Sequence, residues 1–153
     1  LDGPGDTRFL LGIGFFLLMQ VCYSLGFVGL GALTVLKRRW WLPVGALVLW
    51  LALNVVLGPQ LGDMRWPLAV YSAFLVTMAT LSLGVSTRVG TGGVLFLVSD
   101  LLIGLGAADL DVPLRGLLVI STYALAQLLI VTGWVEKVDE WDGVVEPPVA
   151  HRA

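Results

Sequence analysis

The chain has 153 residues, of which 58% are hydrophobic and only 13% are charged. Soluble globular domains average about 45–50% apolar and about 25% charged residues, and a chain of this length cannot hide such an excess in a soluble core. The composition therefore argues against a soluble domain and favours lipid as the solvent. The formal net charge of −2 argues against a nucleic-acid partner, which would require clustered Lys and Arg. A single Cys and a single His exclude a disulfide framework and a Cys or His metal cluster.

The first residues do not have the pattern of a protein start. The chain begins with Leu1, not Met, and residues 1–6 (LDGPGD) precede no short apolar stretch with a small-residue cleavage site, as a signal peptide would. We therefore interpret Leu1 as an interior point of a longer protein.

Five stretches have the length and apolarity of membrane-spanning helices. A bilayer core about 30 Å thick requires about 20 largely apolar residues in helical form, and backbone that faces lipid must satisfy its hydrogen bonds internally. In chain order, the predicted spans are residues 9–36, 41–57, 66–85, 89–105 and 114–135. They are apolar nearly all round, which is typical of membrane helices. We therefore predict an all-α fold, a polytopic transmembrane bundle of five spans.

The boundaries of these spans agree with known helix signals. A basic run (37–39) closes the first span, a Gly-Pro pair (58–59) ends the second, and a Trp-Pro pair (66–67) opens the third, where proline suits the first helical turn. Residues 1–135 thus form the predicted transmembrane domain. Residues 136–153 are acidic and contain prolines, so we expect a solvated, disordered C-terminal tail.

The distribution of Lys and Arg predicts an orientation. With five spans, six basic residues lie on one side of the membrane and three lie on the other. The positive-inside rule then places the first loop and the C-terminal tail in the cytoplasm, and the membrane is the plasma membrane if the source is bacterial. The larger group contains Lys37, Arg38, Arg39, Arg88, Lys137 and Arg152.

Asp100 is the acidic residue that the pattern places deep inside a span, with apolar residues on both sides. A charge at that depth costs roughly 2.5–3.5 kcal/mol on insertion scales, so such residues usually face a bundle interior or a wet cavity and mark function. The alternative is a protonated carboxyl that only bonds a neighbouring helix. We favour the functional interpretation.

Other polar side chains within the spans are candidates for the same cavity. Tyr123 and Gln127 are four residues apart, and Gln20 and Tyr23 are three apart, so each pair shares one helical face. Taken singly, such residues more often join membrane helices by hydrogen bonds. Further candidates are Asn54, Tyr71 and Thr77.

The later spans carry a family resemblance. Residues 92–100 (GGVLFLVSD), followed by a span with YALAQLLI at 123–130, resemble the YhhN-like lysoplasmalogenase family. The resemblance also covers the early Gly-Asp segment (5–6), the aromatic helix after it, and the middle span that contains Tyr71. The family usually has a histidine shortly before the tyrosine of the early span, where this chain has Gln20. Family members are usually described with eight spans, which implies three spans ahead of this chain.

The resemblance implies a hydrolase that cleaves the vinyl ether bond of lysoplasmalogens to a fatty aldehyde and a glycerophospho-base, with a lysophospholipid substrate taken from the bilayer and no cofactor. Asp100 is then the expected general acid and Asp6 the base or electrostatic partner, by analogy with other oxocarbenium chemistry. Ser99 and Gln127 are expected to orient the carboxyl or the water, and Tyr123 to bond the leaving oxygen. Further polar pocket residues are Gln20, Tyr23 and Tyr71. A transporter or proton-coupled carrier that uses Asp100 is the alternative, and a structural membrane subunit is the third option.

Overall fold

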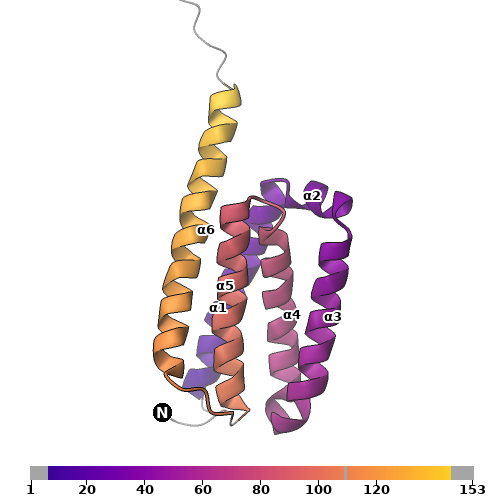
Figure 1. The fold of residues 1–153 in the computed structure, drawn as a ribbon, viewed down its shortest axis with the longest axis vertical. Coiled ribbons are helices and arrows are strands. Elements are labelled where there is room, and N and C mark those ends of the chain that lie inside the picture. The colour runs from indigo at the N-terminus through magenta and orange to yellow at the C-terminus, as the bar shows by residue number, and fades with distance from the viewer. Residues whose placement is uncertain (1–6, 109, 146–153) are drawn as a thin grey trace, which may run out of the picture.

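The computed structural model describes residues 7–108 and 110–145, and over these residues the chain is helical without strands. The long helices lie side by side, and the short helix α2 crosses one end of the bundle (Figure 1). The elements are α1 (Thr7–Gly29), α2 (Ala32–Arg38), α3 (Trp41–Leu57), the 3-10 helices η1 (Gly58–Gln60) and η2 (Gly62–Met64), α4 (Arg65–Ser82), α5 (Thr87–Ala107) and α6 (Arg115–Val145).

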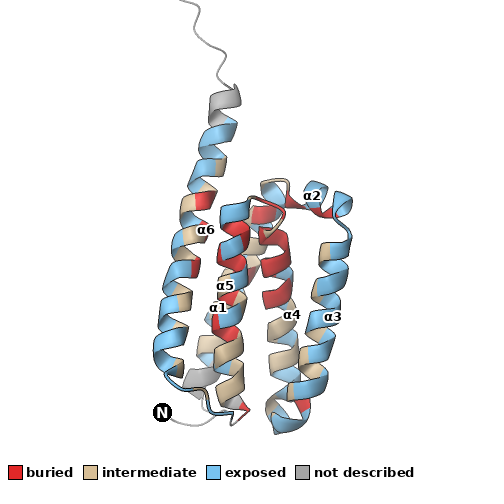
Figure 2. Cartoon of the chain, in the orientation of Figure 1, coloured by how far each residue is buried: buried red, intermediate tan, exposed pale blue. Residues whose placement is uncertain are grey.

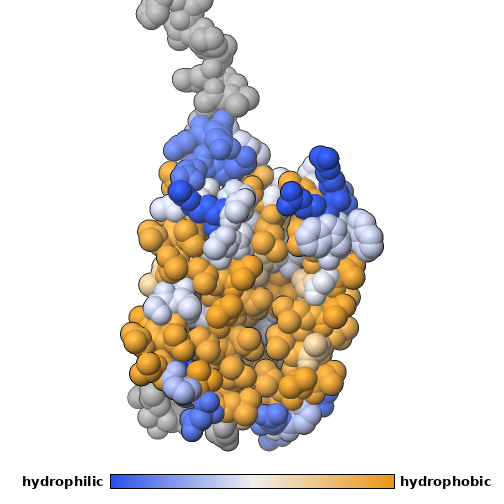
Figure 3. Space-filling view, in the orientation of Figure 1, coloured by the Kyte–Doolittle hydropathy of each residue, from blue (hydrophilic) through white to orange (hydrophobic). Residues whose placement is uncertain are grey.

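Four helices of the described chain are long and apolar enough to cross a membrane, namely α1, α3, α5 and α6. Their apolar side chains form a broad surface belt with hydrophilic residues at both ends (Figure 3), and the chain is an integral membrane protein. The predicted third span, residues 66–85, corresponds to α4, which forms a helix at the expected place. Because α4 packs against α1, α3 and α5, its polar side chains can face protein instead of lipid. Since α4 is not among the four candidate spans, the count of five spans stays a prediction.

The predicted first span, residues 9–36, is divided in the structure. Helix α1 ends at Gly29, and Gly31 has a φ of 84°, a left-handed conformation that glycine adopts without steric cost. The chain then turns into α2, which crosses the end of the bundle (Figure 1). The expectation of one span over residues 9–36 is therefore corrected to two helices, because an apolar run does not reveal a backbone turn inside it.

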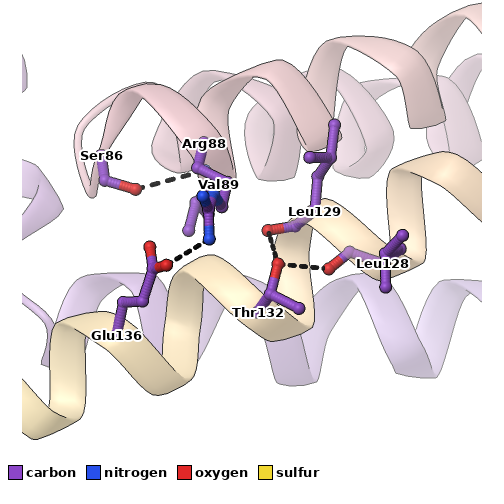
Figure 4. A network of polar contacts seen from close by, with 7 residues as sticks. All are labelled: Ser86, Arg88, Val89, Leu128, Leu129, Thr132 and Glu136. Carbon is purple, nitrogen blue, oxygen red and sulfur yellow. Dashed lines mark hydrogen bonds and ion pairs between the residues drawn. The ribbon is translucent and has the colours of Figure 1, made fainter.

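The expectation of a disordered tail from residue 136 is also corrected, since α6 continues to Val145. Ion pairs support this extension: Glu136 pairs with Arg88 of α5 (Figure 4), and Lys137 Nζ lies 2.7 Å from Glu140 Oε2, three residues further along the helix. In the same region Ser86 Oγ accepts a 3.2 Å hydrogen bond from Val89 N and caps α5 (Figure 4). Residues 146–153 lie outside the described residues.

Close packing is concentrated in the half of the bundle nearest α2, where buried residues gather on α4 and α5 (Figure 2). Glycines of α5 permit the approach of both neighbours. A Cβ on Gly92 would lie 2.9 Å from the Ala126 carbonyl oxygen of α6, and one on Gly93 would lie 2.8 Å from Ser82 Cβ of α4. Phe27, Met78 and other fully buried residues fill the space between the helices.

Candidate active site

The half of the bundle away from α2 contains a cavity of about 380 Å³, enclosed by α1, α3, α4, α5 and the connection between α3 and α4. Most of its wall is apolar, with residues such as Phe16, Leu57 and Leu97. The polar side chains that line it are Asn54, Tyr71, Ser72 and Asp100. Within the described residues, no three His, Cys, Asp or Glu side chains gather in an arrangement that could hold a metal ion.

Asp100 lies in the cavity wall on α5, and only 8% of its surface is exposed. The hydroxyl of Tyr71 on α4 donates a hydrogen bond to Asp100 Oδ2. The topology explains the meeting. A short turn joins α4 to α5, and Tyr71 precedes this turn by about as many residues as Asp100 follows it, so the two lie at the same level. Asp100 has no other hydrogen bond to the described residues, so its Oδ1 atom bonds none of them.

The remaining polar groups of the cavity wall are bonded within their own region of the fold. Asn54 Nδ2 donates to the Trp50 carbonyl oxygen at 2.8 Å, and Ser72 Oγ donates to the Ala69 carbonyl oxygen at 3.0 Å while it accepts from Trp50 Nε1 at 3.1 Å. Ser72 was not predicted from the sequence. Its position next to Tyr71 on one helix is the signal that could have indicated it.

Gln20 is fully buried in α1, next to Tyr71, but outside the cavity wall. Neither its amide nitrogen nor its amide oxygen has a hydrogen-bond partner among the described residues. A buried amide without partners is costly. Gln20 was predicted as a polar residue of the pocket; the structure places it beside Tyr71 and outside the cavity wall.

Tyr23 and Gln127 meet each other and do not reach Asp100. The Tyr23 hydroxyl donates to Gln127 Oε1 at 2.6 Å, and Gln127 Nε2 lies 3.6 Å from Met19 Sδ. Tyr123 shares the α6 face of Gln127, as predicted, and packs with ring centroids 5.9 Å from Phe16 and 5.6 Å from Phe96. These contacts join α1 to α6 next to the cavity.

Ser99 and Asp6 complete the predicted set. Ser99 is buried, and its hydroxyl donates to the Val119 carbonyl oxygen of α6 at 3.1 Å, so it ties α5 to α6. The structure therefore does not bring Ser99 or Gln127 into hydrogen-bond contact with the Asp100 carboxyl. Asp6, the predicted second carboxyl, lies outside the described residues.

Aromatic rings of α1 and α6 pack together beside the Tyr23–Gln127 hydrogen bond, toward the end of the bundle that carries α2. The Tyr23 and Phe27 rings stack with centroids 5.8 Å apart, and Trp134 of α6 lies 5.5 Å from Phe27. Gly26 leaves room for this indole, since a Cβ there would lie 1.8 Å from Trp134 Cη2. These packed rings join α1 to α6 toward the α2 end of the bundle.

Comparison with known proteins gives one result. The sequence model of the YhhN family matches residues 4–134, a range that includes α1 to α5, the Asp100–Tyr71 pair and most of α6. No curated protein and no solved structure matches the chain. Because the matched range covers most of the sequence, the chain belongs to the YhhN family.

Proposed function

We propose that this protein is a membrane-embedded hydrolase that cleaves the vinyl ether bond of lysoplasmalogens, releasing a fatty aldehyde and a glycerophospho-base. The observation that carries the proposal is the carboxyl of Asp100, held by Tyr71, in the wall of an apolar cavity. Membership of the YhhN family is compatible with this activity.

The cavity suits the substrate class in size and polarity. Its volume of about 380 Å³ falls in the range of small-molecule sites, which are mostly apolar with a few placed polar groups. A lysoplasmalogen has a single hydrocarbon chain, so it can leave the bilayer laterally and place the start of that chain in the cavity. The carboxyl then lies among apolar side chains, next to the alkenyl carbons.

The chemistry requires one proton donor at that position. In the first step the Asp100 carboxyl transfers its proton to the alkenyl carbon that is beta to the ether oxygen, and the C=C π pair forms the new C–H bond. This leaves an oxocarbenium ion and a carboxylate. Water then adds to the cationic carbon and returns a proton to the carboxylate, and the hemiacetal collapses to aldehyde and alcohol. A positioned general acid typically contributes 10²–10⁴-fold to such a rate.

Tyr71 is placed to fix the geometry of this proton transfer. Its hydroxyl donates to Asp100 Oδ2, which leaves Oδ1 to carry the proton and to face the substrate. After the transfer the same hydrogen bond becomes charge-assisted and stabilises the carboxylate. Asp6 is proposed as the base or electrostatic partner, with Asp100 as the acid.

The carrier alternative has less support. A proton-coupled carrier requires a polar route that reaches both faces of the bundle. On the α1 and α6 side of the site, the rings of Tyr23, Phe27 and Trp134 and the core around Met78 fill the space toward the α2 end, so the described residues form no polar route there.

The test is release of aldehyde from a purified lysoplasmalogen by the protein in lipid nanodiscs. The matched control substrate has a saturated alkyl ether, which protonation on carbon cannot cleave. We expect aldehyde from the vinyl ether alone, and none from Asp100→Asn. Loss of activity in Asp100→Ala with full activity in Asp100→Asn would rule out the proton-donor role, because an amide cannot supply this proton.

A further inference from the structure

The cavity-facing stripe of α4 ends in a cation. Leu68, Ser72 and Leu75 line the cavity and follow one another at spacings of four and three residues, which places them on one helical face. Arg65, the first residue of α4, lies three positions before Leu68 and continues the same stripe toward the end of the bundle away from α2.

Contacts hold the Arg65 side chain at the edge of the cavity. Gly58 is buried and lines the cavity, and a Cβ on Gly58 would lie 3.1 Å from Arg65 Nε, so the guanidinium side chain covers this glycine. The Arg65 guanidinium carbon also lies 5.3 Å from the centroid of the Trp66 ring. Arg65 is exposed, and the ion pairs of the described residues, Arg88–Glu136 and Lys137–Glu140, do not involve it.

We propose that Arg65 binds the phosphate of a lysophospholipid whose chain occupies the cavity. The inference rests on the proposed function and names the part of the substrate that is recognised. A guanidinium offers paired donors that match phosphate oxygens. An apolar cavity with a cation at its edge is complementary to an amphiphile with one chain and an anionic head group.

The rise along α4 between Arg65 and Tyr71 agrees with the length of the substrate. Arg65 and Tyr71 are six residues apart in α4, which is roughly 9 Å along the helix axis, and Tyr71 bonds Asp100. In a lysoplasmalogen, seven bonds separate the phosphorus from the alkenyl carbon that accepts the proton. With bonds of about 1.5 Å, an extended chain of that length also covers roughly 9 Å. One molecule can therefore contact Arg65 with its phosphate and Asp100 with its vinyl ether.

The experiment measures binding, so that it does not depend on hydrolysis. The protein carries Asp100→Asn and is in nanodiscs, and the probes are lysophosphatidylethanolamine and a monoacylglycerol of the same chain, which lacks the phosphate. Arg65→Gln is compared with Arg115→Gln, which removes the same charge at the same end of the bundle, where the Arg115 guanidinium packs on Gly106. Unchanged helical content and a monodisperse elution profile confirm that both variants are folded.

We expect Arg65→Gln to weaken binding of the lysophospholipid about tenfold or more, the loss of a hydrogen bond to a charged group, with monoacylglycerol binding unchanged and Arg115→Gln without effect on either probe. Equal losses for both probes, equal effects of the two variants, or no effect of Arg65→Gln would overturn the proposal. Inorganic phosphate that displaces the lysophospholipid at equal concentration would also overturn it, since the site would then hold free phosphate.

The two proposals fail separately. Phosphate-dependent binding through Arg65 without aldehyde release from the vinyl ether by the protein with Asp100 intact would refute the hydrolase and leave the lysophospholipid site. Aldehyde release that Arg65→Gln leaves unchanged, together with unchanged binding, would refute the phosphate contact and leave the hydrolase.

Discussion

Two glutamines inside the bundle, Gln20 buried and Gln127 half-buried, provide a test of how hydrogen bonds stabilise it. Gln20 is fully buried and its amide has no partner among the described residues. Gln127 accepts a 2.6 Å hydrogen bond from Tyr23. Methionine has a similar volume and shape, so Gln→Met at either position changes the polarity of the site and little of its packing. The two substitutions should therefore change stability in opposite directions.

The magnitudes follow from the contacts. Gln20→Met removes a desolvated amide, and burial of such an amide without hydrogen bonds costs about 1–3 kcal/mol by mutational data, so the variant should be more stable by about 1–2 kcal/mol. Gln127→Met leaves the part-buried Tyr23 hydroxyl without its acceptor, which costs about 1 kcal/mol or more. Polar pairs within membrane bundles average about 0.6 kcal/mol, so we expect Gln127→Met to lower the free energy of unfolding by about 1 kcal/mol.

The assay is reversible unfolding of the detergent-solubilised protein, followed by helical content as the fraction of denaturing detergent increases. Wild type, Gln20→Met and Gln127→Met are compared under identical conditions, and the sign of each change is the result. Destabilisation by Gln20→Met equal to that by Gln127→Met would refute the reasoning. It would mean that the Gln20 amide makes hydrogen bonds in the membrane, through water or through the neighbouring Tyr71 hydroxyl.

Three further outcomes are expected. Tyr71→Phe should lower kcat for vinyl ether cleavage about tenfold or more through loss of a hydrogen bond to a charged group, measured by aldehyde release; unchanged kcat would contradict its role. Gly93→Ala should lower the free energy of unfolding by about 1–3 kcal/mol, because its Cβ would lie 2.8 Å from Ser82 Cβ. Gly104→Ala should leave the free energy of unfolding unchanged, because no atom lies within 4 Å of the added Cβ. Ser99→Ala should keep kcat within about twofold, because its hydroxyl bonds the α6 backbone; a larger kcat loss in a stable variant would indicate that it acts on the site.

Membrane location and helical class could be predicted from the sequence because a lipid environment permits few backbone structures. A run of about 20 apolar residues in a bilayer has to satisfy its own backbone hydrogen bonds, which a helix does. The prediction that Asp100 faces a partner or a cavity followed from the same reasoning, since a buried carboxyl among apolar residues is costly without one. The structure supplies both, as Tyr71 and as the cavity that Asp100 lines.

The partners of the polar residues could not be predicted in the same way. Spacing along one helix identifies which residues share a face, as for Tyr123 and Gln127, but not which helix that face meets. Tyr71 meets Asp100 because the turn between α4 and α5 sets their level, whereas Gln127 meets Tyr23. The position of Arg65 also depends on the contact with Gly58, which only the fold reveals.

The placement of Asp100 links stability to the proposed chemistry. If its carboxyl faced lipid, insertion would cost several kcal/mol, and if every lone pair were bonded to protein, no atom would be available for a substrate. The structure lies between these limits, since Tyr71 donates to Oδ2 and Oδ1 has no hydrogen bond to the described residues. Dense packing near α2, where Gly92 and Gly93 allow a close approach of the helices, holds α4 and α5 in register. That register keeps Tyr71 opposite Asp100 in the less densely packed half, where a substrate has room to bind.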